Sequence, residues 1–110
     1  MPRLPKPFLQ FTGENPAIAR AYEALGAACA KAGPLDAQTR ELVKLGMAIG
    51  GRLEGGVHAH TRRALEAGAT SEQIRHVVAL AAPTLGFATT VAASTWVEDV
   101  LAGARRKSRR

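Results

Sequence analysis

Two titratable side chains, Glu41 and His60, occupy positions where a purely structural pattern favours apolar residues. Glu41 lies at the edge of an apolar helical stripe, one turn before Leu45, and His60 lies near the middle of the apolar side of the next expected helix. If these helices form an antiparallel hairpin, the carboxylate and the imidazole face each other. Such a pair in a half-buried pocket can move protons as general acid and base. The alternative is structural, with a solvated glutamate and a histidine whose hydrogen bonds are satisfied in the core.

Basic residues next to this pair are suited to an anionic substrate. We assign His58, Arg62 and Arg63 as candidate substrate-binding residues beside the candidate catalytic residues Glu41 and His60, although the two arginines also fit a solvated face. A metal site is not expected, because residues two apart on a helix point about 200° away from each other, and His58 and His60 therefore cannot share one ion within a subunit. No other Cys or His lies at ligand spacing, and no cofactor is expected.

The elements that position these groups are helices, and the sequence predicts an all-α bundle of five to six of them. Local signals mark the boundaries: Asn15 before Pro16, Gly68 after the third helix, and a capping box formed by Thr70 and Gln73. The expected helices cover residues 15–33, 36–52, 54–67, 70–82 and 87–102, preceded by an irregular arm at 1–14. The residues expected to face inward are Ile18, Tyr22, Leu25, Cys29, Leu42, Leu45, Ile49, Ile74, Val77, Val78, Ala81, Val91, Trp96, Val97 and Leu101.

Length and charge indicate a single domain at residues 1–104, followed by a basic tail at 105–110 that we expect to be disordered. The formal net charge is +6, but five of the positive charges lie in that tail, which leaves ten basic and nine acidic residues in the body. Nucleic acid is therefore an expected partner only through the tail. The single cysteine, Cys29, excludes an intrachain disulfide, and no signal peptide or membrane span is apparent, so we expect a cytoplasmic protein.

The segment from Arg40 to Thr70, RELVKLGMAIGGRLEGGVHAHTRRALEAGAT, resembles the carboxymuconolactone decarboxylase and alkylhydroperoxidase-D-like superfamily. Its most specific part is a Glu, 18 intervening residues and a His, followed by RALEAGAT. The likeness continues through SEQIRHVVALAAPTLGFATTVAAS and covers roughly residues 15–102. It implies an all-helical bundle that assembles as a trimer or hexamer, for which Phe87, Trp96 and Val97 are interface candidates, with ordinary core as their alternative role.

The same resemblance implies two kinds of chemistry. In the peroxidase branch the His ends a Cys-x-x-Cys-x-x-x-His motif, and Leu53 and Gly56 stand here where the cysteines would be. A thiol peroxidase is therefore disfavoured, because it would have to rely on Cys29. The decarboxylase branch implies acid–base chemistry by Glu41 and His60 on a small carboxylated lactone or ring compound. A family-type peroxiredoxin activity and a non-catalytic oligomeric binding protein remain the alternatives.

Overall fold

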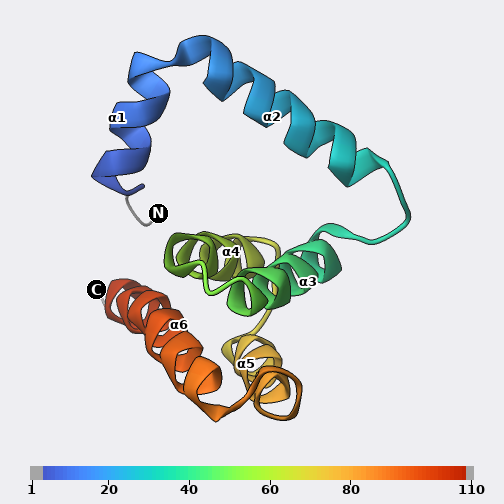
Figure 1. Cartoon of the computed structure of the whole chain (residues 1–110), viewed down its shortest axis with the longest axis vertical. Helices are drawn as coiled ribbons and strands as arrows, with labels where there is room; N and C mark the ends of the chain where they lie inside the picture. Colours follow the sequence, from blue (N-terminus) through green and yellow to red (C-terminus); the bar gives the residue numbers. More distant parts are fainter. Residues whose placement is uncertain (1–3, 109–110) are drawn as a thin grey trace. The chain divides into compact units, whose positions relative to one another are not determined.

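The computed structural model describes residues 4–108, with side chains described as far as Ala104, and every regular element in that range is an α-helix. Six helices follow one another (Figure 1): α1 (Lys6–Glu14), α2 (Pro16–Lys31), α3 (Ala37–Gly50), α4 (Glu54–Glu66), α5 (Ser71–Leu85) and α6 (Phe87–Ser108). The all-α prediction is confirmed. The chain divides into two compact units, Met1–Leu35 and Asp36–Arg110.

The first unit corrects the prediction of an irregular arm at 1–14, because residues 6–14 form α1. Proline usually opposes a helix, but Pro7 lies in the first turn of α1, where the missing N–H costs no intrahelical hydrogen bond. Asn15 separates α1 from α2, and its side-chain Nδ2 donates to the Phe11 carbonyl 2.9 Å away. Asn15 therefore satisfies a carbonyl at the end of α1 as well as preceding Pro16 at the start of α2.

The predicted burial of the α2 stripe is wrong for the single chain. Ile18, Tyr22, Leu25 and Cys29 are all exposed, and no residue of α1 or α2 is buried. The spacing correctly identified an amphipathic helix, but a unit of this size with one short neighbouring helix cannot enclose a core.

Local signals explain the boundaries of α3 and α4. The Asp36 side chain accepts a hydrogen bond from the Thr39 N–H at 2.8 Å, which caps the start of α3. The α3 helix ends in a Schellman motif, in which Arg52 has a φ of 54° and the Leu53 N–H donates to the Ala48 carbonyl at 2.9 Å. The α4 helix ends in the same way at Gly68, whose φ of 95° suits a residue without a side chain.

The last two helices begin where predicted and end later. Thr70 and Gln73 form the expected capping box at the start of α5. The helix passes through Pro83 and ends at Leu85, so the expected stop before the proline is wrong. Because α6 continues to Ser108, the helical backbone also extends into residues 105–108 of the segment expected to be a disordered tail, whereas Arg109 and Arg110 lie outside the described residues.

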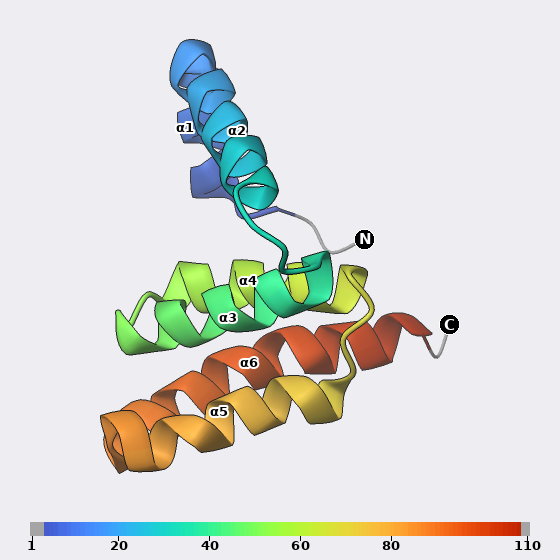
Figure 2. The same cartoon turned by 90° about the vertical axis from the view of Figure 1, so that its right-hand side faces the viewer.

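The core of the second unit lies between two helical hairpins. Figure 2 shows α3 and α4 side by side over α5 and α6, with α4 packed on α6 and α3 on α5. Its largest fully buried side chains are Leu45, Ile49, Ile74, Leu101, Val57, Val97 and Thr61. Leu42, Val77 and Trp96 pack against this core from its edge, while Val91 and Phe87 are exposed, which corrects the inward placement of Val91. No helix in the described part of the chain is long and apolar enough to cross a membrane.

The hairpin of α3 and α4 is close-packed at Gly56. A Cβ added at Gly56 would lie 3.2 Å from the Ala48 Cβ and 3.3 Å from the Leu53 Cβ, closer than ordinary contact. Ala48 is buried, so its Cβ has little freedom to withdraw. The absence of a side chain at Gly56 is what lets the two helices approach each other here.

Candidate active site

Glu41 and His60 are in direct contact across the α3–α4 hairpin. His60 Nδ1 lies 2.8 Å from Glu41 Oε1, and both side chains are mostly buried, with 15% of the Glu41 side chain and 17% of the His60 side chain exposed. The distance is that of a strong hydrogen bond with a charged partner, in which the Nδ1–H donates to the carboxylate. Because Nδ1 is engaged, Nε2 is the nitrogen that remains for a substrate.

The helical register of α4 explains why His60 faces α3. Val57, Thr61 and Ala64 form the buried stripe of α4, and at about 100° per residue His60 falls on one flank of that stripe and His58 on the other. The partners agree with this division, because His60 contacts Glu41 on α3, whereas His58 Nε2 lies 3.1 Å from Asp99 Oδ2 on α6.

A second contact fixes the other oxygen of the Glu41 carboxylate. Lys44 lies one turn later on α3, and its Nζ is 3.4 Å from Glu41 Oε2. Burial raises the pKa of the Glu41 carboxyl, but the His60 hydrogen bond and the positive charges of Lys44 and His60 outweigh it, so that this pKa lies below its ordinary value. The carboxylate is therefore ionised at neutral pH. Sequence reasoning missed Lys44, although its spacing of three residues from Glu41 was a usable signal.

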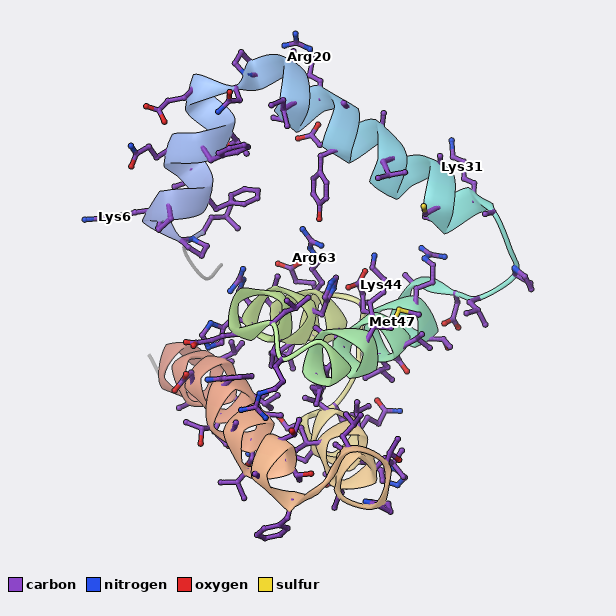
Figure 3. The ribbon with its side chains drawn as sticks, viewed as in Figure 1. Lys6, Arg20, Lys31, Lys44, Met47 and Arg63 are labelled. Carbon is purple, nitrogen blue, oxygen red and sulfur yellow. The ribbon has the colours of Figure 1, made fainter. Side chains whose placement is uncertain are left out.

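The candidate substrate-binding residues do not gather at one place. Arg63 follows His60 by three residues and lies on the same flank of α4, and Figure 3 shows Arg63 and Lys44 projecting from the same face of the α3–α4 hairpin. Arg62 lies nearer to the flank of His58, which is bonded to Asp99. The geometry therefore brings one of the three candidates, Arg63, to the side of the Glu41–His60 pair.

The positions that carry cysteines in the peroxidase branch are occupied by residues without thiols. Leu53 is the N-cap residue of α4, and Gly56 lies in the first turn, at the close contact with Ala48. Cys29, the one cysteine of the chain, is exposed on α2 in the first unit. Among the described residues, no group of three or more His, Cys, Asp or Glu side chains is arranged to hold a metal ion.

Comparison with known proteins finds a relative that matches part of the chain and a solved structure with a similar fold. The chain is 42% identical over 59 residues to an uncharacterized protein of Haemophilus influenzae, an alignment that covers 54% of this chain and 52% of that protein. The chain thus spans about half the length of this relative. The crystal structure of a carboxymuconolactone decarboxylase family protein from Legionella pneumophila, in its apo form, has a similar fold, with a TM-score of 0.69 and 23% identity over 84% of this chain and 83% of that one.

The sequence profile of the carboxymuconolactone decarboxylase family matches residues 16–99, a range that contains both Glu41 and His60 and most of the two units. The chain therefore belongs to the carboxymuconolactone decarboxylase family.

Proposed function

We propose that the protein catalyses acid–base chemistry, decarboxylation or proton transfer, on a small carboxylated lactone or ring compound. The observation that carries the proposal is the 2.8 Å contact between His60 Nδ1 and Glu41 Oε1 in a mostly buried setting. A carboxylate on one ring nitrogen fixes the orientation of the imidazole and stabilises the positive charge that the ring carries when its other nitrogen holds a proton. His60 is thus the proton-transfer group, and Glu41 holds it in place.

In a decarboxylation, the bond between the ring carbon and the departing carboxylate breaks, and its electron pair passes into the adjacent conjugated carbonyl system. Carbon dioxide leaves an enolate, and His60 Nε2–H delivers a proton to a carbon of this conjugated system as the electron pair returns from the oxygen and the carbonyl is restored. In an isomerisation, the same nitrogen removes a proton from one carbon and returns it to another. Both reactions use an acidic or carboxylated substrate, and Arg63 is the cation we propose for binding it, because Arg63 shares the flank of His60.

The experiment that tests this function is turnover of 4-carboxymuconolactone and of related carboxylated lactones by the purified full chain. We expect turnover to fall by at least about 100-fold in His60→Ala, the usual range for loss of a general acid or base. We expect a loss of similar size in Glu41→Gln, because the carboxylate orients the imidazole and stabilises its positive charge. Asp99→Asn is the matched control, because it alters the other His–carboxylate contact, at His58, and leaves His60 untouched. Equal losses in Asp99→Asn and Glu41→Gln, or full activity in Glu41→Gln, would contradict the assignment.

A thiol peroxidase is the second candidate function, and the exposure of Cys29 is the observation in its favour. Against it, the chain has no second cysteine, and neither position 53 nor position 56 carries a thiol. Peroxide consumption by the wild type that disappears in Cys29→Ser would support this candidate. A non-catalytic binding role through the basic tail is tested by deleting residues 105–110, which would abolish salt-dependent nucleic-acid binding if the tail carries it.

We also propose that the chain forms a homo-oligomer, a trimer or hexamer. The exposed apolar side chains of α2, with the 77% exposed Phe87, support this proposal, because such surface is costly to leave in water. Light scattering after size-exclusion chromatography measures the mass directly. A monomer at micromolar concentration would contradict the proposal.

A further inference from the structure

We propose that Lys44 is a positioning residue of the Glu41–His60 pair, which keeps the Glu41 carboxylate oriented and ionised so that His60 presents Nε2 to the substrate. The inference rests on the proposed function, because it assigns a role within the same site. The inference follows from the different partners that the two carboxylate oxygens of Glu41 contact. Oε1 contacts His60 Nδ1 at 2.8 Å, and Oε2 contacts Lys44 Nζ at 3.4 Å.

The two contacts together define the plane of the carboxylate. With Lys44 on one oxygen and His60 on the other, a rotation that turns the carboxylate out of this plane would lengthen both contacts, so the plane that offers an oxygen to the imidazole is favoured. Lys44 belongs to the same helix as Glu41, one turn away, while His60 comes from α4, so the carboxylate is held from its own helix and from the neighbouring one. The Lys44 side chain is 43% exposed, and its contribution to folding stability is consequently small.

The charges around Glu41 show why a cation is needed. Burial is the largest influence on the pKa of Glu41 and favours the neutral acid, and it is opposed by the His60 hydrogen bond and by the charges of Lys44 and His60. Arg40 precedes Glu41 on α3, and Arg63 lies on the flank of α4 that faces α3. The helix α5 meets α3 through apolar side chains such as Val77 and Ala81.

Three charged side chains of α5 and α6, among those that the structure describes, have partners other than Glu41. Asp99 of α6 contacts His58, and Arg75 of α5 contacts Glu98 of α6 through two hydrogen bonds. Among the described residues, Lys44 and His60 are the cations whose charges lower the pKa of Glu41. Without Lys44, the effect of burial on the pKa of Glu41 is less completely opposed, so the carboxyl takes up a proton at a higher pH.

Protonation of Glu41 would change what His60 offers to a substrate. A neutral carboxyl can donate its own proton to Nδ1, which places the ring proton of a neutral imidazole on Nε2, so that Nε2 can no longer accept the proton that the isomerisation removes from its substrate. It also removes the negative charge that stabilises a protonated ring. Lys44 thus acts on the chemistry through Glu41, without touching the reacting atoms.

The test is a ¹³C NMR titration of the full chain labelled at the glutamate side-chain carboxyls. The chain has seven glutamates, and the Glu41 signal is the one missing in Glu41→Gln. We expect Lys44→Gln to move the titration midpoint of Glu41 upward and Lys44→Arg, which keeps the charge, to leave it near the wild-type value. Circular dichroism verifies that each variant is folded. An unchanged midpoint in Lys44→Gln, or an equal shift in both variants, would overturn the proposal.

The titration needs no substrate, so it is independent of the proposed function. If a carboxylated lactone is turned over, the acid limb of the pH–rate profile should move in the same direction as the Glu41 midpoint in Lys44→Gln and stay in place in Lys44→Arg. An acid limb that stays in place while the midpoint moves would overturn the positioning role. Absence of turnover in the wild type would instead count against the proposed function, and the NMR result would still decide whether Lys44 controls Glu41.

Discussion

Replacing Glu41 and His60 by alanine, singly and together, measures how strongly their contact couples α3 to α4. A hydrogen bond with a charged partner contributes about 1.5–3 kcal/mol to stability. The two side chains are 15% and 17% exposed, so water still reaches them and the lower part of this range applies. We therefore expect a coupling free energy of about 1.5 kcal/mol at pH 7, which corresponds to a change in Tm of roughly 6–12 °C for a unit of this size.

The chain provides a matched control in His58 and Asp99. Their nitrogen and oxygen lie 3.1 Å apart, and Asp99 is 57% exposed, so we expect a coupling of about 0–1 kcal/mol from the same double-mutant cycle. Alanine is a strong helix former at all four positions, and effects of each single substitution cancel in the cycle. The assay is urea unfolding followed by the fluorescence of Trp96, the one tryptophan, which packs against the core of the second unit. A coupling at Glu41–His60 no larger than that at His58–Asp99 would refute the reasoning from burial.

Three further predictions concern stability. Because folding lowers the pKa of Glu41, its contribution to the free energy of unfolding is present above the ordinary pKa of 4.5 and is lost as the pH falls through the folded pKa. The difference in unfolding free energy between wild type and Glu41→Gln should therefore shrink over that pH window. A difference that grows instead would contradict the direction of the pKa shift. Arg52→Gly should be more stable than Arg52→Ala by about 1 kcal/mol, because both lose the side chain but only glycine adopts a φ of 54° without strain, and equal Tm values would exclude this explanation. Ile74→Ala, at a fully buried position, should cost about 2–5 kcal/mol in urea unfolding, and a loss below 1 kcal/mol would place Ile74 outside the core.

The parts of the fold that sequence predicts well are those determined by neighbouring residues. The Thr70–Gln73 capping box and the glycine after α4 are present as expected, because each requires only a few adjacent residues to form. The α1 helix was missed because a proline usually indicates the absence of a helix, whereas Pro7 lies in a first turn, where a helix tolerates it.

Contacts between distant residues were predicted less completely. The stripe of Leu45 and Ile49 identified the buried face of α3, and the proposed approach of Glu41 to His60 is present as a contact. The exposure of α2 could not be predicted, because an amphipathic pattern shows that a helix has an apolar face but does not show what covers that face. The pairing of His58 with Asp99 was also beyond the sequence, since it depends on which flank of α4 packs against α6.

The close approach of α3 and α4 at Gly56 has a consequence for the redesign of this chain. Cysteines at positions 53 and 56 would require a Cβ that lies 3.2 Å from the buried Ala48 Cβ, so the α3 backbone would have to withdraw by a few tenths of an ångström. A redesign that places a thiol pair at these positions would therefore have to adjust the packing of α3 as well. Packing at Gly56 therefore limits which side chains the first turn of α4 can accept.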